Sequence, residues 1–272
     1  ADNNTAFGYD ALATNTTGTR NTAVGALALD TSTTGDQNTA VGYGAMDANT
    51  TGSNNVAIGD AALASNTTAS NNTAVGDDAL KFNTTGTQNV AVGALSLDAN
   101  TTGSYNTALG EKSLSTNILG AKSTAVGTFS LFNQNPASAV DMYNVAVGYD
   151  AGNAVTTGVQ NTLIGGLAGD AITTGGVNTA VGYNSLGANT TGGGNTAVGK
   201  DALSANTTGY SLQALGFLAL TANTTGHSNS AIGESALAAN TTGASNVAVG
   251  NNALDANTTA SNNTAVGYFA LC

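Results

Sequence analysis

Residues 21–37 read NTAVGALALDTSTTGDQ, and the next seventeen, residues 38–54, read NTAVGYGAMDANTTGSN. The same unit returns along the whole chain. Its sixteen copies begin at residues 4, 21, 38, 55, 72, 89, 106, 123, 144, 161, 178, 195, 212, 229, 246 and 263. Every interval is 17 residues except the one between Ser123 and Asn144, which is 21. Self-similarity at a fixed period indicates a repeat architecture, in which each unit packs on its neighbours.

A unit of seventeen residues is too short for a helix pair, which needs about 33 residues, and suits one coil of a β-solenoid. Positions 1–5 of the repeat carry β-branched residues that favour a strand, and position 5 is Gly in every copy. The frequent Asn-Thr-Thr-Gly segment at positions 12–15 is typical of a turn. The sequence therefore predicts an all-β fold, a parallel β-solenoid or β-roll of about sixteen 17-residue coils, each with two short strands and two turns.

Residues 1–272 are predicted to form a single repetitive β-solenoid shaft with an irregular insertion at 133–143. The insertion contains the only proline, Pro136, and we expect it to leave the coil as a loop that could form a local contact site. Just after it, Gly152 and Gly169 replace the Leu that most coils carry at position 9, which predicts a bend or a small cavity. Because the chain opens inside a repeat, we expect an excerpt of a longer fibre.

The composition excludes several classes of function. Five Lys and Arg against sixteen Asp and Glu give a net charge of −11, which disfavours binding to nucleic acid or to anionic membranes. No run of 18 apolar residues is present, so we expect no membrane insertion. One His and one Cys cannot form a zinc site or an intrachain disulfide, and the acidic residues are too scattered for calcium-binding repeats. We therefore expect no enzyme, no metal and no cofactor.

The distribution of charge over the repeat is uneven. Nineteen of the 21 charged residues lie within the copies, and these occupy only positions 6, 7, 10, 16 and 17. Positions 1–5 carry none, although a strand with one face in water should tolerate charge on that face. We expect this strand to be buried on both faces, one inside the coil and one against an identical chain. Because each coil offers only the aliphatic side chains of positions 4 and 9, we expect two or three chains to join along their length. We predict a side-by-side homotrimer, with a dimer as the alternative.

The NTAVGYxAL…NTTG unit resembles the repeats of trimeric autotransporter adhesin heads and of phage-type tail-fibre shafts. Autotransporter heads are left-handed parallel β-rolls that trimerise side by side, and their unit centres on a similar Ser/Asn-x-Ala-Ile/Val-Gly pentad. The likeness covers all units from Asn4 to Cys272, although the unit here is longer than the head repeat and closer in length to tail-fibre repeats.

This resemblance implies the structural shaft or stalk of an extracellular, cell-surface or virion fibre. Its function would be spacing and surface attachment, that is adhesion, without catalysis. The implied partners are copies of the chain itself and a host-surface glycan or protein receptor.

Position 6 carries a column of aromatic residues. Because the same position accepts Asp and Lys in other coils, we expect it to face solvent. Exposed aromatic rings could stack on sugars and make the chain a glycan-binding adhesive head, or they could simply cover the neighbouring turn. The candidate glycan contacts are Tyr43, Tyr149, Tyr183 and Tyr268, and the same column contains Tyr9 and Phe217.

The turn segment supports two further hypotheses. Ten Asn-Thr-Thr triplets are formal glycosylation sequons, but Asn stacked in successive turns can instead form a ladder of side-chain amides, which the absence of charge at position 12 favours. The paired Thr at positions 13 and 14 form two rows that could match ice, or could serve the turn alone. The candidate glycosylation sites are Asn15, Asn49, Asn66, Asn83, Asn100, Asn189, Asn206, Asn223, Asn240 and Asn257.

Overall fold

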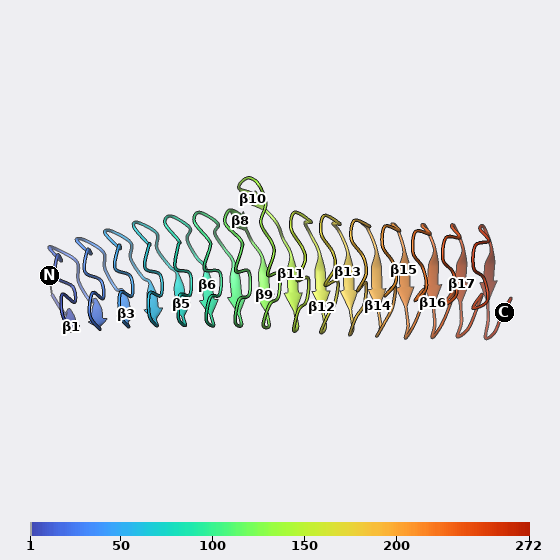
Figure 1. Cartoon of the computed structure of the whole chain (residues 1–272), viewed down its shortest axis with the longest axis horizontal. Helices are drawn as coiled ribbons and strands as arrows, with labels where there is room; N and C mark the ends of the chain where they lie inside the picture. Colours follow the sequence, from blue (N-terminus) through green and yellow to red (C-terminus); the bar gives the residue numbers. More distant parts are fainter. Residues whose placement is uncertain (1) are drawn as a thin grey trace. The chain divides into compact units, whose positions relative to one another are not determined.

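The computed structural model describes residues 2–272. It is an all-β parallel β-solenoid of about 15 turns with ~17 residues per turn, which confirms the predicted fold class. The chain divides into two units, the first ending at Asp141 and the second spanning Met142–Cys272. In both units each coil contributes one three-residue strand at positions 2–4 of the repeat, drawn as one arrow per coil in Figure 1.

The first unit contains ten strands. Eight of them form a parallel sheet in chain order, and β8 pairs with β10 in a separate small sheet. Within the large sheet every residue pairs with the one 17 positions later, as Ala23 does with Ala40. The strands are β1 (Thr5–Phe7), β2 (Thr22–Val24), β3 (Thr39–Val41), β4 (Val56–Ile58), β5 (Thr73–Val75), β6 (Val90–Val92), β7 (Thr107–Leu109), β8 (Gly120–Ala121), β9 (Thr124–Val126) and β10 (Val140–Asp141).

The second unit repeats the same design. Its eight strands form parallel pairs in chain order with the same 17-residue register, as in the pairing of Ala180 with Ala197. The strands are β11 (Val145–Val147), β12 (Thr162–Ile164), β13 (Thr179–Val181), β14 (Thr196–Val198), β15 (Gln213–Leu215), β16 (Ser230–Ile232), β17 (Val247–Val249) and β18 (Thr264–Val266). A constant repeat length therefore sets a constant register.

The prediction of two strands per coil is wrong. Opposite the strand, residues at positions 7 and 9 adopt left-handed backbone conformations, such as Leu27 (φ 60°) and Leu29 (φ 52°), so this segment cannot pleat as a strand. Its backbone still hydrogen-bonds to neighbouring coils: the Leu29 N–H donates to the Ala45 carbonyl at 3.1 Å, and the Leu27 N–H donates to the Tyr9 carbonyl at 2.9 Å. These bonds offset left-handed strain of about 1–2 kcal/mol per residue.

The core of each coil combines small apolar, large apolar and amide side chains. In the coil that begins at residue 38, Asn38, Ala40, Ala45, Met46 and Asn49 are fully buried. These residues occupy positions 1, 3, 8, 9 and 12. One large aliphatic side chain per coil, at position 9, therefore fills an interior that is otherwise built from alanine and asparagine.

Position 4 does not belong to this core, contrary to the prediction. Side chains alternate across a strand, so when the Ala at position 3 points inward, its neighbours at positions 2 and 4 point outward. Accordingly Ile58 and Ile232 at position 4 remain 41% and 46% exposed. Ala57 and Ala231, which precede them at position 3, are fully buried.

The small cavity expected beside Gly169 is also absent. A Cβ atom at Gly169 would lie 2.7 Å from Cδ1 of Ile172 and 2.8 Å from Cδ2 of Leu163. Leu163 replaces the usual Ala of position 3, and Ile172 replaces the usual Asn of position 12. Both are fully buried, so two larger side chains fill the volume that the missing Leu leaves.

The coil from which the insertion leaves keeps the hydrogen bonds of its core. The Ser123 hydroxyl donates to Oε1 of Gln134 at 3.2 Å, and Nε2 of Gln134 donates to Oδ1 of Asn117 at 3.3 Å, so the buried polar network continues in this coil. The chain then leaves as an exposed loop and returns along β10, which pairs in parallel with β8. Figure 1 shows this loop projecting on the side away from the large sheet of the first unit.

The glycine at position 5 is required by geometry. At Gly182 the backbone has φ +134°, and a Cβ atom would lie 2.6 Å from the carbonyl oxygen of Gly199 in the next coil. No side chain fits this approach, and L-residues rarely adopt this φ. Gly therefore occupies position 5 in all sixteen copies.

We predict that Gly182→Ala lowers the free energy of unfolding by about 2–4 kcal/mol, because the new methyl group forces neighbouring coils apart. Gly166→Ala is the matched control: its Cβ would meet Tyr183 at an ordinary 3.7 Å, and other coils carry Ala at this position. Chemical denaturation of both variants measures the difference. Equal stability of the two variants would contradict the steric explanation.

Candidate functional site

The first candidate site is the outer strand face, defined as the side chains at positions 2 and 4 of each coil, that is, the first and last residues of β1–β7, β9 and β11–β18. This face is half-buried in most coils and becomes exposed at residues such as Val198, Leu215 and Ile232. It carries Thr, Val, Ile, Leu and similar uncharged residues throughout. Each unit therefore presents a continuous, neutral and largely apolar stripe along its sheet.

The aromatic column at position 6 faces solvent, as expected for a position that accepts charge. Tyr43, Tyr149, Tyr183 and Tyr268 are between 53% and 75% exposed. Their glycan contacts remain a prediction. The structure does not gather them into one cluster: Tyr149 and Tyr183 are separated by the coil that carries Gly166, and Tyr268 packs edge-on against Phe269 at 4.5 Å between ring centroids.

Electrostatics distinguish two members of this column. The charge of Asp150 raises the pKa of the Tyr149 phenol, and a hydrogen bond between the two side chains acts in the same direction. At Tyr9 the hydrogen bond to Asp10 is the first cause of a raised pKa, followed by the charge of Asp10. Both phenols therefore remain protonated at neutral pH and can donate hydrogen bonds.

The Asn residues at position 12 form a ladder of side-chain amides inside the solenoid. In the second unit, Nδ2 of Asn206 donates to Oδ1 of Asn189 at 2.9 Å, and Nδ2 of Asn223 donates to Oδ1 of Asn206 at 2.9 Å. Each Nδ2 also donates to a carbonyl in its own turn, as Asn206 does to Gly209 at 3.0 Å. The ladder anticipated from the uncharged position 12 is therefore present.

The sequence analysis missed a second ladder at position 1. Oδ1 of Asn38 accepts the backbone N–H of Asn55 at 3.0 Å, and Nδ2 of Asn38 donates across the coil to the Gly52 carbonyl at 2.8 Å. Asn49 donates to the same carbonyl at 3.1 Å. The signal that could have revealed this ladder is the recurrence of Asn at position 1, which a strand does not otherwise favour.

Burial of position 12 bears on the glycosylation hypothesis. Eight of the ten sequon candidates, those from Asn49 to Asn240, are fully buried, and their Nδ2 atoms donate hydrogen bonds. Asn15 and Asn257, near the two ends of the described chain, are partly exposed. A glycan on a buried amide would displace the ladder, so the geometry disfavours glycosylation of the folded chain, which remains a hypothesis.

The two Thr rows have different environments. The position-13 hydroxyl donates to the position-13 carbonyl of the next coil, as Thr207 does to Thr224 at 3.0 Å. The position-14 Thr, such as Thr208, is exposed. The position-13 hydroxyls therefore already donate hydrogen bonds within the protein, whereas the position-14 row takes no part in this ladder of hydrogen bonds. Ice binding by paired rows remains a hypothesis with less geometric support.

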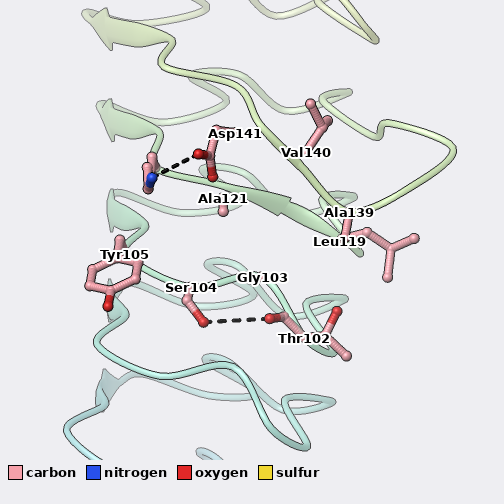
Figure 2. Close-up of a pocket in the computed structure, with 10 residues that line it drawn as sticks. Thr102, Gly103, Ser104, Tyr105, Leu119, Ala121, Ala139, Val140 and Asp141 are labelled. Carbon is pink, nitrogen blue, oxygen red and sulfur yellow. Dashed lines mark hydrogen bonds and ion pairs between the residues drawn. The ribbon is translucent and has the colours of Figure 1, made fainter.

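A third candidate site is a surface depression of about 470 Å³ beside the insertion. It is lined by Thr102, Gly103, Ser104, Tyr105, Leu119, Ala121, Lys122, Ala139, Val140 and Asp141. Figure 2 shows Tyr105 and Asp141 on one side of it and Leu119 and Ala139 on the other. Nζ of Lys122 lies 2.7 Å from Oδ2 of Asp141, so an ion pair joins the coil to the insertion.

Tyr105 and the Ile118-Leu119 pair were not recognised in the sequence. Among the coils that reach positions 13 and 14, all carry Thr-Thr there except the coil that begins at residue 106, which carries Ile118-Leu119, and the coil with the insertion. Tyr105 occupies position 17, where the two neighbouring coils carry Gln88 and Lys122. The available signal was that both departures from the repeat precede the insertion within two coils.

Two carboxyl groups at position 10, those of Asp98 and Asp170, are partly buried, and burial shifts the pKa of each. Burial raises the pKa of Asp98, although a hydrogen bond from the Ser115 hydroxyl opposes the shift. Burial likewise raises the pKa of Asp170, whose Oδ1 atom is buried without a hydrogen-bond partner. Within residues 2–272, no three His, Cys, Asp or Glu side chains lie close enough together to bind a metal ion.

Comparisons with models of protein families, with curated proteins and with solved structures gave no match to this chain. Over the part of the chain that the structure describes, no helix has the length and apolarity needed to cross a membrane. What is established is therefore the 17-residue-period parallel β-solenoid itself.

We predict that Asn206→Asp destabilises the protein by about 3 kcal/mol or more at pH 7, because it places a carboxylate inside the amide ladder. Burial should raise the pKa of this new carboxyl, so the loss should shrink as the pH falls to 4. Asn206→Ser is the control, since Ser32 occupies the same position in a coil that keeps its Leu at position 9. Denaturation at both pH values tests this, and a pH-independent loss for Asn206→Asp would contradict it.

We predict that Asp170→Asn raises the melting temperature at pH 7 by about 1–2 °C. The folded pKa of Asp170 is raised, so this residue's relative contribution is most favourable below the ordinary Asp pKa of about 3.9 and is lost as the pH rises. The gain of the variant should therefore vanish at pH 3. Calorimetry from pH 3 to 7 measures it, and a gain of constant size would show that desolvation is not the cause.

Proposed function

We propose that this chain forms part of the shaft of an extracellular, cell-surface or virion fibre, in which identical chains pack side by side through the outer strand face. Its role is mechanical: it spaces and attaches other parts of the fibre, and it performs no catalysis. The single observation that carries this proposal is the absence of charge from a face that points out of the coil in every copy of the repeat.

Several other exposed positions of the repeat carry charge, although the exposed position 14, which is nearly always Thr, does not. Nineteen charged residues occupy positions 6, 7, 10, 16 and 17, whereas positions 2 and 4 carry none in sixteen copies. The interior does not explain this, because positions 2 and 4 lie outside the core of the single chain. A solvated sheet face normally alternates or mixes polar and charged residues. Exclusion of charge is what a face buried in an assembly requires.

A second copy of the chain is the partner that fits this face best. The stripe repeats at every coil, so an identical chain presents side chains with the same spacing along its whole length. The stripe is neutral, so two copies can approach there despite a net charge of −11 on each. Burying the exposed half of one aliphatic side chain contributes about 1 kcal/mol, and this gain recurs at each coil.

The resemblance to autotransporter heads and tail-fibre shafts supports a trimer over a dimer and a location outside the cell or on a virion. In such an assembly the charged positions stay in water, and the aromatic column at position 6 stays available for a glycan or protein receptor. An ice-binding role is the weaker alternative, because the position-13 Thr hydroxyls already donate hydrogen bonds to the next coil.

We predict that Ile232→Asp reduces the particle mass in dilute buffer to that of a single chain, because it places a charge in the outer strand face. Glu234→Lys is the matched control in the same coil: its side chain is exposed, and position 6 accepts Lys200 elsewhere. Light scattering after size-exclusion chromatography measures the mass of each variant.

The unsubstituted chain should have the mass of a trimer, and Glu234→Lys should retain it. A single-chain mass for the unsubstituted protein, or equal masses for both variants at unchanged circular dichroism, would contradict assembly through this face.

A further inference from the structure

The depression beside the insertion is a place where the repeat departs from its own pattern in three ways at once. The insertion adds Ala139, Val140 and Asp141 to one wall. Leu119 replaces the Thr that most coils carry at position 14, and Tyr105 is a large aromatic residue at position 17, where most coils carry a small or polar residue. These changes come from segments that are distant in sequence, and the fold brings them to one depression of about 470 Å³ (Figure 2).

The apolar part of the depression is accessible. Tyr105 is 54% exposed and Val140 is 40% exposed, while Leu119 is partly buried. None of these side chains is needed to close the coil, whose core lies at positions 1, 3, 8, 9 and 12. Large apolar groups at a hollowed surface are typical of a ligand site rather than of a solvated turn.

The polar part of the depression contains a positively charged and a negatively charged side chain next to each other. Lys122 and Asp141 form an ion pair at 2.7 Å, with side chains 38% and 45% exposed, so both charged groups meet solvent. Ser104 and Thr102 add hydroxyl groups to the lining, and the Ser104 hydroxyl donates weakly to the Thr102 carbonyl at 3.5 Å. An ammonium and a carboxylate together offer several donors and acceptors within a few ångströms.

We propose that this depression binds a saccharide ring. The face of Tyr105 suits the C–H face of a pyranose, because an aromatic π-face is electronegative and the sugar C–H groups are weakly positive. The Lys122–Asp141 pair suits neighbouring hydroxyls, which both donate and accept hydrogen bonds. The volume lies within the range of about 300–1,000 Å³ that is usual for small-ligand sites.

Other ligand classes fit less well. A phosphate or a sulfate would meet the Asp141 carboxylate beside the single ammonium of Lys122, on a chain whose net charge is −11. A metal cation would meet the Lys122 ammonium and only one carboxylate. A neutral ligand rich in hydroxyl groups avoids both conflicts.

This site differs from the tyrosine column proposed above and does not depend on assembly of the chain. Tyr105 lies at position 17, whereas the column lies at position 6 of the repeat. The outer strand face is formed by positions 2 and 4, which do not line the depression. Loss of saccharide binding and loss of assembly are therefore separate outcomes.

Saturation-transfer NMR on the full chain tests the proposal with four probes, the methyl glycosides of glucose, galactose, mannose and N-acetylglucosamine, and with sorbitol as an acyclic control. We expect saturation of the ring protons of at least one glycoside and none of sorbitol. Titration of that glycoside should show at least a fivefold weaker affinity for Tyr105→Ala. Leu119→Thr, which restores the residue of most other coils and so keeps the fold, should weaken binding at least threefold.

Tyr210→Ala is the matched control, because Tyr210 is exposed to a similar extent, at 50%, and belongs neither to the depression nor to the position-6 column. It should bind the glycoside like the unsubstituted chain, and circular dichroism should show the same melting temperature for all variants within about 2 °C. The proposal is overturned if no glycoside is saturated, if sorbitol is saturated equally, or if Tyr210→Ala weakens binding as much as Tyr105→Ala.

Discussion

The structure depends on the close approach of successive coils, which lets the backbone of one coil hydrogen-bond to the next at a constant step of 17 residues. This approach leaves no room for a side chain where the strand turns: a Cβ atom at Gly42 would lie 2.2 Å from the Gly59 carbonyl oxygen. Hydrogen bonds between coils continue beyond the strands, as from Thr31 to Asp47 at 3.1 Å. A three-residue strand is therefore sufficient, because almost the whole coil takes part in the same ladder.

The interior follows from the same constraint. A narrow coil has space for one large side chain, so much of the remaining core is made of alanine and of asparagine amides, which must be hydrogen-bonded when buried. In most coils two amides meet that requirement by donating to one carbonyl, as Asn38 and Asn49 do to Gly52. The coil thus closes without help from positions 2 and 4. The absence of charge from the outer strand face, rather than a deficient core, is therefore the reason to expect assembly.

The period alone predicts the class of fold, the parallel sheet and its register, because a constant repeat length allows little else. The ladder at position 12 was also predictable from the uncharged Asn column. The single strand was not, because Leu27 and Leu29 adopt left-handed conformations that their side chains do not favour and only the neighbouring coils stabilise. The same limit applies to Asn38: its residue type suggests a turn, whereas packing places it in the core.

Residues that depart from the repeat have different explanations in the core and in the surface turns. Gly169, Leu163 and Ile172 depart together inside the core, and each compensates for the volume of the others, so packing explains all three. Tyr105 and Leu119 lie at positions that are surface turns in other coils, where no core volume has to be restored. Coil packing therefore gives no reason for them. A ligand that contacts Tyr105, Leu119 and the inserted loop would explain all three departures from the repeat by a single cause.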